Sequence, residues 1–146
     1  MILCDVNVLL HVYRRDSPLH APIREWLEAE ISSGRAFGLS ALGLSGFLRI
    51  ATHPRVFDPP SPMPEALAFV EALRARPNAV MVAPGPNHWT LFTRLCRECG
   101  AKGNLVPDAW FAALAIESGC EWITTDRDYA RFTDLRWRDP TAKDRA

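Results

Sequence analysis

Three aspartates stand where an α/β fold can bring carboxylates together. Asp5 ends the short apolar run at residues 2–4, and Asp126 ends a second such run at residues 121–125. Asp108 lies in the first turn of a predicted helix. In a parallel sheet the carboxyl ends of all strands share one edge, where a crevice opens at a switch in strand order. We therefore expect Asp5 and Asp126 to meet there, and Asp108 to join them if its helix begins near the crevice.

Converging carboxylates repel one another, so each must be protonated or share a cation. Hard divalent ions such as Mg²⁺ and Mn²⁺ prefer carboxylate oxygens and keep waters that a phosphate can displace. Such a site polarises a phosphodiester and lowers the pKa of a bound water. A single aspartate near a helix start is usually a cap, but shared placement on one sheet edge favours a metal site for Asp5 and Asp126.

Short apolar strands alternate with amphipathic helices along the whole chain. We predict strands at residues 2–4, 36–39, 79–82, 121–125 and 135–137, and helices over about 7–13, 18–33, 41–51, 65–76, 88–99 and 105–118. This alternation predicts an α/β fold, a three-layer α/β/α sandwich with a mostly parallel five-stranded sheet. Trp89 is among the residues expected to face inward from the helix at residues 88–99.

Length and composition indicate one compact domain. The chain has 146 residues, of which 48% are hydrophobic and 23% charged. We predict a single domain over residues 1–140 and a frayed polar tail over residues 141–146. No apolar stretch approaches the about 20 residues that cross a bilayer, and Asp5 precedes any signal-peptide core. We therefore expect a cytoplasmic protein with no membrane contact, and since 17 basic residues balance 17 acidic ones, any nucleic-acid surface must be local.

Four cysteines raise the question of a zinc or redox site. Cys96 and Cys99 form a Cys-x-x-Cys pair, whereas Cys4 and Cys120 are isolated in predicted strands. A four-cysteine zinc site needs a second close pair, and reactive pairs lie at the start of a helix rather than at its end. We expect four reduced thiols, buried or half-buried.

Four segments together resemble the PIN-domain proteins, and more narrowly the VapC toxins of bacterial toxin–antitoxin modules, especially the mycobacterial-type group. Their sequences are ILCDVNVLL from residue 2, FLRIATHPRVF from residue 47, GNLVPDA from residue 103 and TTDRDYARF from residue 124. The likeness follows the family's order and spacing over nearly the whole chain.

The resemblance implies the toxin of a type II module, a Mg²⁺-dependent ribonuclease that hydrolyses RNA phosphodiester bonds and is held inactive by a VapB-type antitoxin. Mn²⁺ is expected to substitute for Mg²⁺. By the family's motifs, Asp5 and Asp108 are metal ligands, and Asp126 is a third catalytic acid that acts directly or through water. A homodimer is the expected free state, with the apolar faces at residues 23–31 and 67–73 as dimer seam and as docking surface for a partner helix.

Other residues are expected to support the three acids. The resemblance implies that Asn7 orients the first acid and that Thr124 or Thr125 supplies a hydroxyl near the third. Arg49 is expected either to bind a substrate phosphate or to pair with a site carboxylate.

One position departs from the family's pattern. PIN nucleases usually place a glutamate on the helix after the second strand, six residues beyond a serine like Ser40, and here Gly46 stands there. We expect weaker metal binding than in a four-acid site, with Asp128 as the acid that compensates. Gly46 also motivates the main alternative, a degenerate PIN domain that binds RNA or antitoxin without cleaving.

Three other α/β classes lack their required residues. A phosphoacceptor receiver domain needs an aspartate after the third strand and a lysine after the fifth, where this chain has Pro84-Gly85 and Arg138-Asp139. A haloacid-dehalogenase-type phosphatase needs a second aspartate two residues after Asp5, where Asn7 stands. A dinucleotide-binding domain needs a glycine fingerprint after the first strand, and none occurs.

Overall fold

Five short strands form one sheet in the computed structural model, which describes residues 1–143. The strand order is β3-β2-β1-β4-β5, and every neighbouring pair in this part of the chain is parallel. The strands are β1 (Ile2–Cys4), β2 (Phe37–Leu39), β3 (Ala79–Met81), β4 (Glu121–Ile123) and β5 (Trp137–Arg138). The predicted five-stranded parallel sheet is confirmed.

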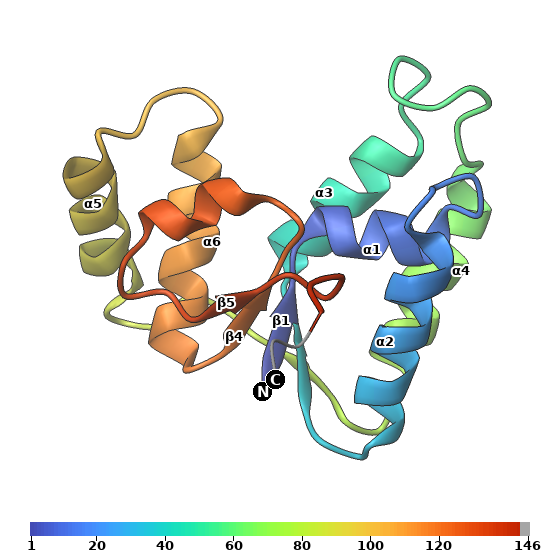
Figure 1. Ribbon diagram of the computed structural model, residues 1–146, viewed down its shortest axis with the longest axis horizontal. Coiled ribbons are helices and arrows are strands. Elements are labelled where there is room, and N and C mark those ends of the chain that lie inside the picture. The colour runs from blue at the N-terminus through green and yellow to red at the C-terminus, as the bar shows by residue number, and fades with distance from the viewer. Residues whose placement is uncertain (144–146) are drawn as a thin grey trace.

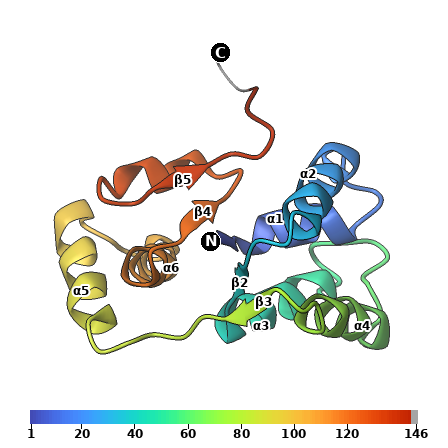
Figure 2. The ribbon, with the colours of Figure 1, turned by 90° about the horizontal axis from the view of Figure 1, so that it is seen from below.

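Helices cover both faces of this sheet (Figure 1). They are α1 (Val6–Tyr13), α2 (His20–Ser32), α3 (Ala41–Ala51), α4 (Met63–Arg74), α5 (His88–Cys99) and α6 (Leu105–Ser118), with a 3-10 helix, η1 (Arg127–Arg131). In Figure 2, α1, α2 and α4 lie on one side of the sheet, and α5 and α6 lie on the other. The three-layer α/β/α sandwich is therefore as predicted. Within residues 1–143 no helix is both long and apolar enough to cross a membrane.

Strand residues contribute to buried clusters on both faces of the sheet. Leu3 and Trp122 pack with α5 and α6 on one face, whereas Phe37 and Leu39 pack with the helices on the other. Ala112 and Ala113 of α6 are fully buried. Because alanine adds little bulk, this helix lies close against the sheet, as its composition predicts.

Local signals set where several helices begin and end. The Asp5 side chain caps α1 by accepting a hydrogen bond from the Val6 backbone N–H, and Ser40 caps α3 in the same way through the Gly43 N–H. Gly100 and Gly119 end α5 and α6 with φ of 60° and 70°, a conformation that costs glycine no strain. The starts of α1 and α3 therefore follow directly from the ends of β1 and β2.

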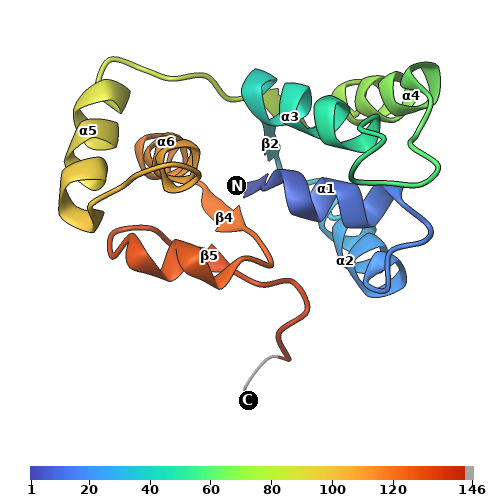
Figure 3. The same cartoon turned by 90° about the horizontal axis from the view of Figure 1, so that it is seen from above.

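Strand order reverses between β1 and β4. The chain passes from β1 to β2 on one side, whereas β4 pairs with β1 on the other side. Asp5 directly follows β1, and Asp126 comes three residues after the end of β4. Figure 3 looks onto this carboxyl edge and shows α1 and η1 leaving it toward opposite faces of the sheet. Asp5 and Asp126 thus follow two neighbouring parallel strands at the point where the strand order switches.

The structure corrects several boundaries. β4 ends at Ile123 rather than at residue 125, because Thr124 and Thr125 lie in the connection to η1, which sequence periodicity did not predict. The fifth strand is Trp137–Arg138, later than the predicted residues 135–137. The predicted tail at residues 141–146 falls partly on residues 144–146, outside the described residues.

Trp89 does not face inward, so that expectation is wrong. Its side chain is 69% exposed, whereas the preceding His88 is buried. The His88 ring forms a hydrogen bond to the Trp110 carbonyl oxygen at 3.0 Å, which directs this side of α5 toward α6. The next residue, about 100° further around the helix, must then point to solvent.

The apolar face predicted at residues 23–31 is not free. Ile23, Leu27 and Ile31 are 0%, 3% and 6% exposed, because they form the contact of α2 with the rest of the domain. At residues 67–73, Leu73 is buried while Leu67 is 41% exposed. Instead of a flat seam, a groove of about 680 Å³ separates α2 from α4.

All four cysteines are free thiols, as expected. Cys120 is buried, and Cys4, Cys96 and Cys99 are half-buried. Burial raises the pKa of Cys4 to about 12, with the nearby Asp5 and Glu30 charges acting in the same direction. The surroundings of this thiol therefore disfavour the reactive thiolate.

Candidate active site

The carboxylate of Asp5 is the best-anchored group at the carboxyl edge of the sheet. It is 9% exposed. The Val6 backbone N–H donates to Oδ1 at 2.7 Å, and Asn7 Nδ2 and Thr124 Oγ1 donate to Oδ2 at 3.0 and 2.8 Å. Three donors therefore fix the carboxylate, and they come from the start of α1 and from the segment that follows β4.

Asn7 and Thr124 also bind each other and join these two segments. Asn7 Nδ2 lies 3.2 Å from Thr124 Oγ1, and Asn7 Oδ1 accepts a hydrogen bond from the Thr125 N–H at 3.4 Å. The Thr124 oxygen accepts another from the Asp126 N–H at 3.0 Å. Of the two threonines considered from the sequence, Thr124 supplies the hydroxyl, while Thr125 contributes its backbone.

Asp126 has a second role as a cap. Its Oδ1 accepts a hydrogen bond from the Asp128 N–H at 2.9 Å and so begins η1. Its other carboxylate oxygen forms no hydrogen bond within residues 1–143. Asp128 itself is exposed.

Asp108 is held by a residue that sequence reasoning missed. Tyr129 donates a hydrogen bond from its hydroxyl to Asp108 Oδ1 at 3.2 Å. The tyrosine is 1% exposed and packs between Trp122 and Phe132, with ring centroids 5.4 and 5.8 Å away. A buried tyrosine needs a partner for its hydroxyl. Its position three residues after Asp126 was the feature of the sequence that could have placed it near the acids.

Burial and like charge act together on these acids. Burial raises the pKa of Asp5 to about 6; hydrogen bonds from Thr124 and Val6 oppose this shift, and the charges of Asp108 and Asp126 add to it. Burial also raises the pKa of Asp108. There the Tyr129 hydroxyl opposes the shift, and the charges of Asp126 and Asp128 reinforce it. The acids are thus close enough to repel one another.

The chemistry of these donors fits a hydrated divalent cation. Asp5, Asp108 and Asp126 offer only carboxylate oxygens, the ligands that Mg²⁺ and Mn²⁺ prefer. Among residues 1–143, no three His, Cys, Asp or Glu side chains stand close enough together to coordinate one ion directly. Mg²⁺ keeps several of its waters and needs only one or two protein carboxylates. The arrangement therefore suits an ion held partly through water.

Gly46 faces the start of α1. A Cβ atom at this position would lie 3.2 Å from Val6 Cγ2, next to Asp5 in the chain. One turn later, Arg49 is exposed and forms no ion pair within the described residues. The expected pairing of Arg49 with a site carboxylate is therefore not found, and contact with a substrate phosphate stays a prediction.

Two solved structures share this fold. VapBC2 from Rickettsia felis, bound to a DNA fragment from its promoter, matches with a TM-score of 0.69 and 13% identity over 94% of this chain and 98% of that chain. VapBC-1 from nontypeable Haemophilus influenzae matches with a TM-score of 0.68 and 18% identity over 97% of this chain and 100% of that chain.

Sequence comparison identifies the family. A family model described as the PIN domain matches residues 2–135. The chain is 43% identical over 136 residues to ribonuclease VapC25 of Mycobacterium tuberculosis, covering 93% of this chain and 96% of that protein. It is 41% identical over 140 residues to VapC ribonuclease Mb2897 of Mycobacterium bovis, covering 96% and 95%. The chain therefore belongs to the PIN-domain family, in its VapC group.

Proposed function

We propose that this protein is a metal-dependent ribonuclease, the toxin of a type II toxin–antitoxin module, and that it hydrolyses RNA phosphodiester bonds. The observation that carries this proposal is the Asp5 carboxylate, fixed by three donors at the switch point and close enough to Asp108 and Asp126 for their charges to raise its pKa. The ribonuclease names of its relatives support the same activity.

Asp5 and Asp108 are the proposed ligands of Mg²⁺, for which Mn²⁺ substitutes, and Asp126 completes the site directly or through water. When bound, Mg²⁺ polarises the scissile phosphate and lowers the pKa of a water. Asn7 and Thr124 keep the Asp5 carboxylate in one orientation, and Tyr129 does the same for Asp108.

Two exposed residues flank this proposed site. Asp128 adds negative charge close enough to raise the pKa of Asp108. Arg49 is the proposed ligand of an RNA phosphate, because its guanidinium has no ion pair within residues 1–143.

The alternative, a degenerate PIN domain that binds RNA or antitoxin without cleaving, rests on Gly46 alone. The anchoring of Asp5 and Asp108 argues against it, because a site without catalytic work has no need to hold two repelling carboxylates in fixed orientations.

We propose that residues 1–140 form the single catalytic domain, and that it acts in the cytoplasm, where RNA is found.

A VapB-type antitoxin is the proposed partner. The solved structures with this fold include VapBC assemblies. The groove between α2 and α4 is lined by apolar side chains that stay accessible or half-buried, Val12, Tyr13, Phe69 and Ala72, with charged residues around them. A partner helix with one apolar face fits such a groove.

A homodimer is the proposed free state. Because the apolar face of α2 is buried, the seam must lie elsewhere. Leu42 of α3 and Val80 and Met81 of the edge strand β3 are 48%, 41% and 49% exposed, and they offer such a surface.

Replacing single acids tests the activity. Asp5→Asn and Asp108→Asn should each abolish cleavage of a labelled RNA in Mg²⁺, because each removes a proposed ligand. Asp126→Asn should cost less if that acid acts through water. The control is Asp134→Asn, an exposed aspartate paired with Arg94. If cleavage persists in excess chelator, or in both Asp5→Asn and Asp108→Asn, the proposed site is not the catalytic one.

The raised pKa of Asp5 predicts how stability depends on pH. The folded protein holds this proton up to a pKa of about 6, against an ordinary value of 3.8. Without metal, stability should therefore fall as pH rises through this window. The effect of Asp5→Asn on the free energy of unfolding should be about 1–2 kcal/mol more favourable at pH 7.5 than at pH 4, because only the ionised carboxylate is costly to bury. Urea unfolding in chelator measures both values, and an equal effect at the two pH values would contradict the assignment.

Tyr129→Phe tests the anchoring of Asp108. It removes only the hydroxyl that donates to Oδ1, so the ring packing remains. Loss of such a hydrogen bond to a ligating carboxylate typically weakens metal binding by about tenfold or more. Calorimetric titration with Mn²⁺ measures this directly. Tyr13→Phe is the matched control, because Tyr13 packs against Phe47 away from the acids, and equal affinity in both variants would rule out the anchoring role.

Gly46→Glu restores an acid where the family's pattern has one. If position 46 reaches the acidic cluster, Mg²⁺ should bind more tightly than to the natural protein. Val6 must shift slightly, because the new Cβ would lie 3.2 Å from its Cγ2. Gly46→Ala is the matched control, since it adds the Cβ and a helix-propensity gain of about 1 kcal/mol without the carboxylate. Equal Mg²⁺ affinity in both folded variants would show that position 46 is not the second-acid position.

A further inference from the structure

A small, mainly apolar pocket opens directly beside the proposed active site. Its volume is about 300 Å³, at the lower end of the range for small-molecule sites. It is lined by one face of α1, the turn that follows α1, and one residue of the α3–α4 loop: Asn7, Leu10, His11, Arg14, Asp16, Ser17, Pro18 and Phe57. The α1 residues recur at helical spacing, so the pocket runs along this helix from its first turn to its end.

One residue that lines the pocket also contacts the proposed catalytic carboxylate. Asn7, which lines the pocket, donates from Nδ2 to Asp5 Oδ2 at 3.0 Å. A group held in the pocket therefore lies one side chain away from the acid proposed to bind the metal. In RNA, base and phosphate are joined through a single sugar. A base in this pocket would place an adjacent phosphate near Asp5.

The wall of the pocket is held in place before any ligand arrives. The Arg14 guanidinium lies 4.1 Å from the centroid of the Phe57 ring and donates to the Pro59 carbonyl oxygen and to Ser61 Oγ at 3.0 and 3.1 Å. It also pairs with Asp16 at 2.6 Å. These contacts fix the α3–α4 loop against the end of α1, so a ligand would spend little binding energy on ordering the loop.

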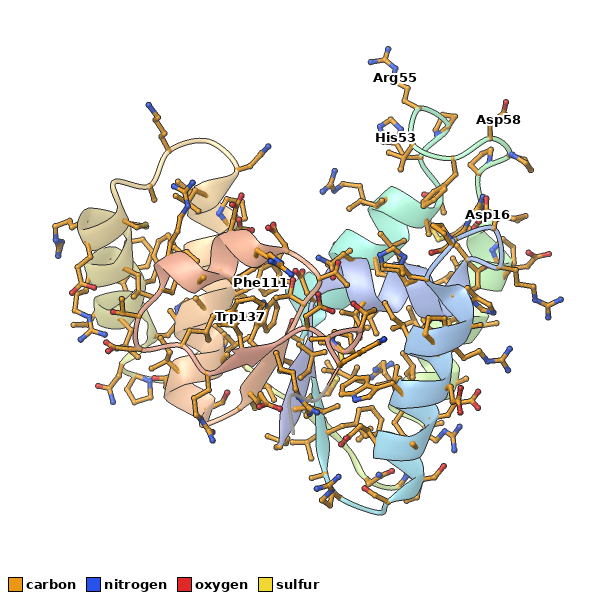
Figure 4. All side chains as sticks on the ribbon, viewed as in Figure 1. Asp16, His53, Arg55, Asp58, Phe111 and Trp137 are labelled. Carbon is orange, nitrogen blue, oxygen red and sulfur yellow. The ribbon has the colours of Figure 1, made fainter. Side chains whose placement is uncertain are left out.

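Figure 4 shows Asp16 and the loop residues His53 and Asp58 at this end of the molecule, with Arg55 pointing outward from the loop. Because Asp16 neutralises Arg14, the pocket carries no free positive charge from that residue. A free anion is therefore a poor fit, and a flat, neutral group is a better one.

His11 gives the pocket one polar atom that is free for recognition. Its Nδ1 is 2.6 Å from Ser17 Oγ, whereas Nε2 forms no hydrogen bond within the described part of the chain. Burial lowers the pKa of His11, which favours the neutral ring. Apolar walls with a single uncommitted hydrogen-bonding atom are typical of sites that select a small planar group by shape and by one polar edge.

We propose that this pocket binds one nucleobase of the RNA substrate next to the phosphate that is cut. The proposal rests on the ribonuclease function argued above. Leu10 and Phe57 contact the face of the base, and His11 Nε2 bonds to its edge. The identity of that base then selects where the RNA is cleaved.

Cleavage of a random single-stranded RNA pool, with sequencing of the new ends, tests the proposal. The natural protein should favour one base at one position beside the cut. This preference should fall by about tenfold in His11→Ala and in Phe57→Leu, the size expected for losing one base contact. His53→Ala is the matched control, because His53 lies in the same loop but does not line the pocket. Circular dichroism of each variant checks that it is folded.

A binding measurement separates this proposal from the activity itself. In the Asp5→Asn background, fluorescence anisotropy compares RNAs that differ only in the base at one position with the same RNA lacking that base, which identifies a preferred base without cleavage. Removing the base should weaken binding by about tenfold, and should have no further effect once His11→Ala is present.

Each outcome decides one of the two proposals. If both pocket variants still cleave RNA with the same base preference as the natural protein, the nucleobase proposal is overturned and the ribonuclease proposal is unaffected. Base-selective binding that depends on His11, without any cleavage by the natural protein, overturns the ribonuclease and supports the pocket. If the protein shows neither cleavage nor base-selective binding, both proposals are overturned. If the pocket variants lose only their binding to a protein partner, the pocket binds a protein segment and the nucleobase proposal is overturned.

Discussion

A carboxylate buried at the end of the first strand is the constraint on which the rest of the site depends. Removing Asp5 from water is costly, and the hydrogen bonds from Val6, Asn7 and Thr124 offset that cost. Two of these donors lie on α1, and the third follows β4. No Lys, Arg or His side chain within residues 1–143 forms an ion pair with the three acids, so their repulsion is left for a bound cation to relieve.

The topology explains how acids from distant parts of the chain reach one place. β1 and β4 are parallel neighbours with their carboxyl ends on the same edge. α6 precedes β4 directly, so its first turn, with Asp108, lies toward that edge as well. Strands of three residues are long enough for this purpose, because each strand needs only to place the residue that follows it at the carboxyl edge. The fold therefore specifies the site mainly through where its strands stop.

Periodicity and the switch-point rule predicted the elements and the placement of Asp5 and Asp126 after neighbouring parallel strands, because both depend on local pattern and on sheet direction. They could not predict the contact of Tyr129 with Asp108, which joins residues 21 apart in the chain through tertiary packing. The same limit explains Trp89, whose orientation depends on a carbonyl of α6. An apolar stripe such as residues 23–31 shows which side of a helix avoids water, but not which part of the protein covers it.

Gly46 packs close to Val6, the residue that follows Asp5. Without a Cβ, Gly46 lets α3 approach Val6 closely, because even one added carbon would lie 3.2 Å from that side chain. The pKa of the neighbouring Asp5 is raised chiefly by burial. A cation must then compete with a proton for this carboxylate, and metal affinity falls as protons become more available. The burial that raises this pKa thus makes metal binding at the proposed site depend on pH.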